Sequence, residues 1–258
     1  MDAGHGRLNR SMFARPAALL LDFGGVLADA PPRRAAPPEL VLRLYNLIRH
    51  ALPPGEIQRS LTAGAQAWAR WRDENHPDEL TQAQVWERFV IGDWPRTAQA
   101  RVRTAIASLS YDWTWRYDWA LRPGIAETLR AAATAGLPMA VVSNTLAGAA
   151  HRDFLTKAGV AGLFGAQLYS DETGVRKPNP QMVWYATQAL GVPAEPCWLV
   201  GDSRVRDIAC ARRADVRTAI LMRSPRTERE DAASGREPAP DAVVADGFGL
   251  LELLTRAL

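Results

Sequence analysis

Two aspartates each follow a short apolar run, where a carboxylate can reach a ligand. Asp22 follows the run at 18–21, and Asp202 follows 197–200 after one glycine. A continuous apolar run that ends at a turn signal is typical of a buried strand, and ligands bind beyond the carboxyl ends of parallel strands. A carboxylate there can act as a nucleophile or hold a hard cation such as Mg²⁺.

Other polar residues stand at comparable points. Ser143 and Asn144 follow the apolar run 139–142, Lys177 begins Lys-Pro-Asn-Pro, and Asp207 comes five residues after Asp202. Each has a plain alternative, since a lysine before proline is commonly a solvated turn residue and an aspartate favours the first turn of a helix. Their fixed order along the chain is what favours a functional reading.

The ordered set Asp22, Ser143, Lys177 and Asp202 resembles the four motifs of the haloacid dehalogenase (HAD) superfamily, over about residues 17–258. The resemblance implies an α/β fold with a Rossmann-like parallel sheet core and an inserted α-helical bundle as a cap domain. Most members are Mg²⁺-dependent phosphatases, so it also implies a hydrolase that acts on a small phosphorylated metabolite through an aspartyl-phosphate on Asp22.

The resemblance also assigns roles. Asp22, Ser143 and Lys177 are expected to be catalytic, with Lys177 adding positive charge near the transferring group. The expected Mg²⁺ ligands are Asp22, the Gly24 carbonyl and Asp202. The remaining site residues are expected to bind substrate, namely Gly25, Asn144 and Thr145, or to support the metal site, namely Asp207 and Ser203.

Gly24 departs from the family pattern. Phosphatases of the family usually carry a second aspartate there, which protonates the leaving group, and glycine has no side chain to do so. Three hypotheses follow: a phosphatase whose acid comes from elsewhere or is not needed, a catalytically weak binding or regulatory module, and a metal-free 2-haloacid dehalogenase. The cap residues considered as a replacement acid are Asp29, Asp73, Glu74 and His76.

The domain prediction follows from a change of periodicity. Residues 1–16 are expected to form a flexible extension, 17–30 and 120–258 the α/β core, and 31–119 the helical cap. The core alternates strands at 18–21, 139–142, 167–169, 197–200, 218–221 and 242–245 with helices, which predicts a parallel sheet. The cap shows helical spacing instead, with one helix expected at 97–109 and a capping box at Thr81 and Gln84. An exposed, mobile loop is expected at 223–240.

Composition sets limits on the other function classes. The 258 residues have a net charge of +3, scattered basic residues and no membrane-length apolar run, so we expect a cytoplasmic protein with neither a nucleic-acid nor a membrane partner. Cys197 and Cys210 are expected to be small buried hydrophobes. Trp68, Trp71 and Trp86 are expected in the cap core, and Trp113, Trp115 and Trp119 along the cleft between cap and core. The sequence leaves the substrate and the oligomeric state open.

Overall fold

The predicted apolar runs form one six-stranded sheet. The computed structural model describes residues 13–33, 35–74, 78–234 and 238–258. The strands are β1 (Leu19–Leu21), β4 (Met139–Ser143), β5 (Ala166–Tyr169), β6 (Trp198–Gly201), β7 (Thr218–Met222) and β8 (Ala242–Val244), in the order β5-β4-β1-β6-β7-β8. Every neighbouring pair is parallel, so all six strands end at the same edge.

Alternation along the strands divides the apolar side chains between two cores. In β1, Leu19 and Leu21 belong to one buried cluster, while Leu20 belongs to the other. The first cluster is covered by α6 (Ile125–Thr134), α7 (Gly148–Lys157) and α12 (Gly247–Ala257). The second is covered by α9 (Gln181–Leu190) and by the helix of η3 (Arg204–Ile208) and α10 (Ala209–Arg213). The Rossmann-like three-layer core expected from the sequence is confirmed.

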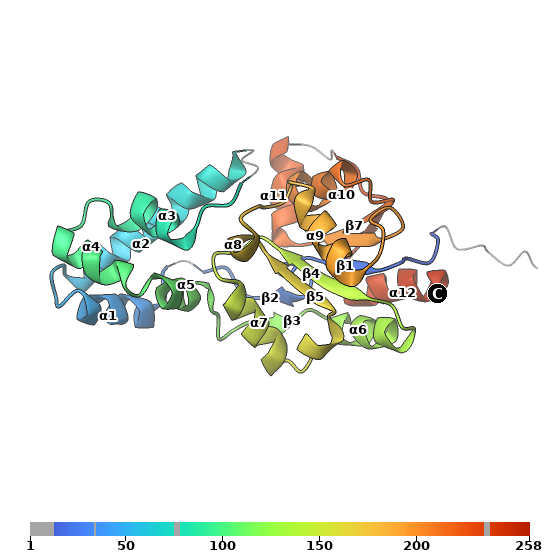
Figure 1. Cartoon of the computed structure of the whole chain (residues 1–258), viewed down its shortest axis with the longest axis horizontal. Coiled ribbons are helices and arrows are strands. Elements are labelled where there is room, and N and C mark those ends of the chain that lie inside the picture. The colour runs from blue at the N-terminus through green and yellow to red at the C-terminus, as the bar shows by residue number, and fades with distance from the viewer. Residues whose placement is uncertain (1–12, 34, 75–77, 235–237) are drawn as a thin grey trace, which may run out of the picture.

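The chain leaves this core after β1 and returns before α6. The strands β2 (Ala28–Asp29) and β3 (Ala120–Leu121), which the sequence did not predict, pair antiparallel at the base of the excursion. Between them lie α1 (Pro38–Leu47), α2 (Pro54–Asp73), α3 (Gln82–Trp86), the π-helical turn η1 (Glu87–Ile91), α4 (Arg96–Arg103) and α5 (Ile106–Thr114). We call this segment the helical insert; Figure 1 shows it as a separate lobe beside the sheet.

The insert has its own apolar core. Trp68, Trp71 and Trp86 are buried in it, as predicted, and so is Trp113. Trp115 and Trp119 pack against the first apolar cluster of the sheet, and Trp113 and Trp119 also line cavities, as expected of cleft residues. The predicted capping box is present at the start of α3, where the Thr81 and Gln84 side chains each bond the other residue's backbone amide.

Three expectations need correction. The segment expected to be a mobile loop at 223–240 contains the helix α11 (Pro225–Ser234), because the polar groups of Ser224 and Thr227 cap its first turn and bond the site residue Asp202. The single helix expected at 97–109 is divided into α4 and α5 at Thr104 and Ala105. The helix α12 was not expected.

The beginning of the chain is described only in part. Residues 1–12 of the predicted extension lie outside the described residues, while Phe13 packs edge-on against Trp198 and Arg15 donates a hydrogen bond to the Ala135 carbonyl. Cys197 and Cys210 are buried free thiols, as predicted. None of the helices in the described ranges combines the length and hydropathy that crossing a bilayer demands.

Candidate active site

The site lies where three adjacent strands end. Asp22 follows β1, Ser143 is the last residue of β4, and Asp202 follows β6. Because β1 lies between β4 and β6, their carboxyl ends form one crevice at the point where the strand order reverses, which is where open α/β sheets bind ligands. The fold therefore brings together residues that are far apart in the sequence.

Both polar contacts of the Asp22 carboxylate with the described residues are made by the same oxygen. Its Oδ1 accepts a hydrogen bond from the Phe23 amide at 2.7 Å and lies 2.9 Å from the ammonium nitrogen of Lys177. Within the described part of the chain, Oδ2 has no hydrogen-bond partner. Burial alone would raise the pKa of Asp22, but the neighbouring Lys177 charge holds that pKa below its usual range. Asp22 is therefore an ionised carboxylate with one oxygen available.

Lys177 is buried between two carboxylates. Its Nζ lies 2.5 Å from Asp207 Oδ1 as well as 2.9 Å from Asp22. Burial opposes its charge, yet the two carboxylates outweigh burial and raise the pKa of Lys177 to about 12. The Asn144 side chain fixes the Lys177 backbone by donating to its carbonyl and accepting from its amide, each at 2.8 Å. Asn144 therefore positions the lysine.

Asp207 is fully engaged within the protein. Its Oδ2 accepts from the amides of Asp202 and Ser203, at 3.1 and 3.0 Å, and its Oδ1 contacts Lys177. Ser203 in turn donates from its hydroxyl to Glu230 of α11 at 2.7 Å. Asp207 and Ser203 thus orient the Asp202 backbone and the lysine.

Asp202 has one buried oxygen without a hydrogen bond. Its Oδ2 accepts from the Ser224 hydroxyl at 2.6 Å, while Oδ1 has no hydrogen-bond partner among the described residues and lies 3.6 Å from the Arg226 guanidinium. Burial raises the pKa of Asp202 to about 6, and the Asp22 charge adds to that rise while Arg226 opposes it. A buried acceptor in this state favours a bound cation.

The three carboxylates are close enough to share a metal ion. One oxygen from each of Asp22, Asp202 and Asp207 lies within 4.8 Å of the other two. Since both Asp207 oxygens are engaged, the oxygens that remain are Asp22 Oδ2 and Asp202 Oδ1. Carboxylate oxygens are what Mg²⁺ prefers, so this donor set fits the ion.

A cavity of about 170 Å³ opens over Asp22 and Asp207. Five of the residues predicted for the site line it beside Gly24, namely Asp22, Ser143, Asn144, Lys177 and Asp207, whereas Asp202 does not. Thr145 does not line it, and its amide, expected to bind substrate, donates instead to the Ser170 hydroxyl at 2.9 Å. The structure therefore groups most of the predicted residues but turns Thr145 inward.

The two glycines after Asp22 have opposite surroundings. At Gly25, φ is +76° and an added Cβ would lie 2.2 Å from Asp202 Oδ2, so only glycine fits. At Gly24, φ lies outside the left-handed region and an added Cβ would meet no atom within 4 Å. The departure at Gly24 therefore leaves open space beside Asp22.

Sequence reasoning missed several residues around this cavity. His151 of α7 stacks on Phe23 with ring centroids 3.7 Å apart, and burial lowers its pKa to about 3, so the ring is neutral. Arg206 and Arg226 also line the cavity. Arg226 and Ser224 went unnoticed because their polar segment reads as a loop, and His151 because one histidine in a helix carries no motif.

Asp29 and Glu74, two of the residues considered as a replacement acid, do not line this cavity. Asp29 of β2 is exposed and lines a wider opening that also includes Gly24 and Asp202. Asp73 is the last residue of α2 and Glu74 follows it. His76 lies outside the described residues.

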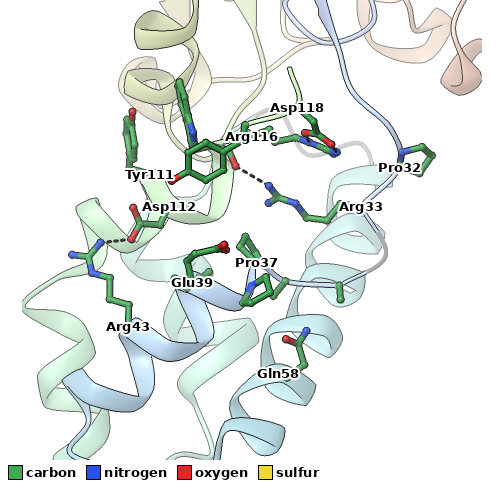
Figure 2. A pocket seen from close by; sticks show the side chains of 16 residues that line it. Pro32, Arg33, Pro37, Glu39, Arg43, Gln58, Tyr111, Asp112, Arg116 and Asp118 are labelled. Atoms are coloured by element: carbon green, nitrogen blue, oxygen red, sulfur yellow. Dashed lines mark hydrogen bonds and ion pairs between the residues drawn. The ribbon is translucent and has the colours of Figure 1, made fainter. Parts of the chain in front are cut away.

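A larger cavity, of about 950 Å³, lies at the base of the insert between α1, α5 and the segment 115–118. Figure 2 shows its charged side chains reaching toward one another. Each of its three arginines has a partner: Arg33 donates to the carbonyls of Trp113 and Trp115, Arg43 pairs with Asp112, and Arg116 pairs with Asp118. These cations are neutralised or bonded within the protein.

A family model of haloacid dehalogenase-like hydrolases matches residues 16–215, and the chain belongs to this family. A phosphoglycolate phosphatase from Colwellia psychrerythraea is 33% identical over 208 residues, which cover 77% of this chain and 80% of that protein. A phosphoserine phosphatase from Thermus thermophilus is 34% identical over 131 residues. That match covers 51% of this chain and spans only 50% of the Thermus protein's length.

Solved structures share the fold. A 2-haloacid dehalogenase from Pseudomonas syringae superposes with a TM-score of 0.60, covering 96% of this chain and 100% of its own, at 19% identity. At that identity the likeness concerns the fold and not the reaction.

Proposed function

We propose that this chain is a Mg²⁺-dependent phosphatase that hydrolyses a small phosphorylated metabolite through an aspartyl-phosphate on Asp22. The observation that carries the proposal is the Asp22 carboxylate, ionised, fixed through one oxygen by Lys177 and Phe23, and lining a cavity with the other oxygen unpartnered. Relatives named as phosphoglycolate and phosphoserine phosphatases support it.

The reaction would run in two displacements. In the first, an Asp22 oxygen attacks phosphorus, a new P–O bond forms, and the bond to the leaving oxygen breaks with its electron pair going to that oxygen. In the second, water attacks the phosphoryl group and returns the carboxylate, releasing phosphate. The Lys177 ammonium and the Ser143 hydroxyl would stabilise the charge that develops on the phosphoryl oxygens.

The proposed metal site uses Asp22 and Asp202, with the Gly24 carbonyl as the third protein ligand. When bound, Mg²⁺ would screen the repulsion between the carboxylate and the phosphate dianion. Ser224 orients Asp202 for this role by bonding its other oxygen, and Asp207 holds the backbone beneath it.

Gly24 supports a second candidate function, a binding module that keeps the ligand site but turns over slowly. General acid–base catalysis contributes typically about 10²- to 10⁴-fold, and glycine supplies none of it. The intact set of Asp22, Lys177 and Asp202 favours an enzyme. The buried carboxylate Asp202 likewise argues against a metal-free dehalogenase.

The test is phosphate release from p-nitrophenyl phosphate, acetyl phosphate and an alkyl phosphate, with Mg²⁺ or with EDTA, beside halide release from a 2-haloacid. Asp22→Asn should abolish phosphate release, whereas Asp112→Asn, in the larger cavity, should retain it. Mass spectrometry of the quenched enzyme should find one added phosphoryl group on the peptide that contains Asp22. Phosphate release by Asp22→Asn at the native rate would overturn the proposal.

A further inference from the structure

A second cavity, of about 230 Å³, lies between the insert and the sheet. Its insert wall comes from α2 and α5, and its other wall from the turn after β4. The residues that line it are Ala65, Trp68, Arg72, Trp113, Thr114, Asn144, Thr145 and Leu146. Asn144 also lines the cavity above Asp22, so the two cavities are neighbours that share this residue. A ligand that occupies both of them would have to reach past Asn144.

Arg72 places a cation in this second cavity. Its guanidinium lies 4.0 Å above the Trp68 ring, and its side chain forms no hydrogen bond or ion pair within the ranges that the structure describes. Burial, reinforced by the charges of Arg206, Arg176 and Arg226 and opposed by the charge of Glu79, lowers the pKa of Arg72 to about 9. The group is therefore still a cation at neutral pH. Its side chain is partly exposed, and its Nε is buried without a hydrogen-bond partner among the described residues, which costs free energy unless a ligand binds it.

Two more polar atoms on the cavity residues lack partners. The indole nitrogen of Trp68 and the hydroxyl of Thr114 are buried, and neither has a hydrogen-bond partner among the described residues. Both can donate, as can Arg72, and the Thr114 hydroxyl can also accept. Buried polar atoms without partners are uncommon in native proteins, and three on one cavity suggest a ligand that accepts hydrogen bonds.

We propose that this cavity binds a second anionic group of the substrate, so that the substrate is a compact phosphate ester with a carboxylate or a second phosphate at its far end. The inference rests on the proposed phosphatase function and adds its substrate class. A planar guanidinium donates two parallel hydrogen bonds to either anion, and Trp68 beneath it holds the plane in place.

A purely structural role for Arg72 has different consequences. Arg72 lies in the last turn of the 20-residue helix α2, where a cation is favoured by the helix dipole. If that were its role, its removal would lower thermal stability and leave ligand preference unchanged. If Arg72 awaits an anion, its removal should relieve repulsion from the nearby arginines and abolish the preference for a second charge.

The experiment measures competitive inhibition of p-nitrophenyl phosphate hydrolysis by three matched phosphonates: propylphosphonate, 3-phosphonopropionate and 1,3-propanediylbisphosphonate. In the native protein the doubly anionic compounds should inhibit roughly 10- to 100-fold more tightly than propylphosphonate, as expected for hydrogen bonds to a charged group. Comparison of the two anionic compounds distinguishes a carboxylate site from a phosphate site. Thermal unfolding of each protein is followed with and without each inhibitor.

Two arginine variants complete the design. Arg72→Met should reduce the preference to under roughly threefold without lowering the unfolding temperature, and Arg72→Lys should restore part of it. Arg43→Met, which removes an arginine paired with Asp112 in the insert, should retain the full preference. Equal inhibition by all three compounds in the native protein, or an unchanged preference in Arg72→Met, would overturn the inference alone. Absence of p-nitrophenyl phosphate hydrolysis would overturn the proposed function as well.

Discussion

The region around Arg43 and the region around Lys177 differ in whether their charged and polar groups all have partners within the protein. In the larger cavity at the base of the insert, each of the three arginines is bonded within the protein. At the smaller cavity beside β1, Asp22 and the adjacent Asp202, which does not line it, each keep an oxygen without a hydrogen bond from the described residues, and Arg72, in the neighbouring cavity, forms no ion pair with those residues. Cavity volume alone would therefore favour the first region as the binding site, whereas polar groups without hydrogen-bond partners favour the second.

The difference has a physical cause. A charge neutralised by its neighbours gains little from a ligand, while a buried charge or acceptor without a partner raises the energy of the folded state until something binds it. Binding sites are therefore expected where the fold keeps such groups. The comparison predicts that changes in the smaller cavity have large effects and that changes in the larger one have small effects.

The largest effect is expected from Lys177→Met. Loss of the ammonium leaves Asp22 and Asp207 buried without their cation, which should lower the free energy of unfolding by roughly 3 to 5 kcal/mol. Activity toward p-nitrophenyl phosphate should fall at least ~10²- to 10³-fold, since a donor to the transferring group is lost. Urea unfolding and steady-state kinetics measure the two. A variant as stable and as active as the native protein would show that Lys177 neither neutralises these carboxylates nor takes part in the reaction.

Gly24→Asp should produce the next largest effect, as a gain. The open space at Gly24 and its ordinary φ admit a side chain, and a carboxylic acid there can protonate the leaving oxygen. Turnover of alkyl phosphates should rise by ~10²-fold or more, and that of aryl phosphates, whose leaving groups need less protonation, should rise less. The measurement is a leaving-group series on both proteins under saturating Mg²⁺.

Gly25→Asp is the matched control for this gain, because its Cβ would collide with Asp202 and it should lose activity toward every ester. A flat leaving-group series in the native protein would mean that another residue already supplies the proton. Asp29 and Glu74 would then be the first described positions to substitute.

The pH dependence of stability should show the raised pKa of Asp202. In the folded protein this pKa is about 6, above the ordinary 3.8, so the folded state binds the proton more tightly than the unfolded state. The associated stability is fully present below about pH 4 and is lost as pH rises through 6. In EDTA, the native protein should lose about 1 to 2 kcal/mol more than Asp202→Asn between about pH 5 and pH 8.

The same unfolding series with Mg²⁺ sharpens the test. The ion should stabilise the native protein at pH 8 because it binds the ionised carboxylate, and it should not stabilise Asp202→Asn. Equal Mg²⁺ stabilisation of both proteins would place the ion elsewhere.

The smallest effect is expected in the larger cavity. Arg43 and Asp112 form an ion pair with both side chains partly exposed, 42% and 34%, so Arg43→Met should change the free energy of unfolding by less than about 1 kcal/mol. Activity toward p-nitrophenyl phosphate should stay within twofold of native. A large loss of activity in this variant would break the comparison, since it would tie a fully paired region to function.

The parts of the molecule that the sequence predicted are those governed by local pattern. The apolar runs ending at Asp22, Ser143 and Asp202 became adjacent strands, because such runs are buried only inside a covered parallel sheet. Their common edge followed from that topology, so the grouping of these residues did not depend on knowing any side-chain position.

The parts that were missed depend on long-range partners. The segment 223–240 is too polar to show the apolar stripe by which an amphipathic helix is recognised. Its helix is held in place by Ser224 and Thr227, which bond Asp202 from more than twenty residues away. The pairing of β2 with β3 and the unpaired state of Arg72 are likewise tertiary facts. Neither composition nor residue spacing predicts such contacts.

Leu146 has a consequence for how this protein can change over generations. Among the described residues, it is the one member of the insert's buried apolar cluster that comes from outside residues 36–113. The insert and the sheet thus share little of the packing on which either depends. Substitutions in the insert can accumulate with little cost to the stability of the sheet. If the insert sets substrate preference, as proposed for Arg72, that preference can change without disturbing the packing that holds Asp22 and Lys177.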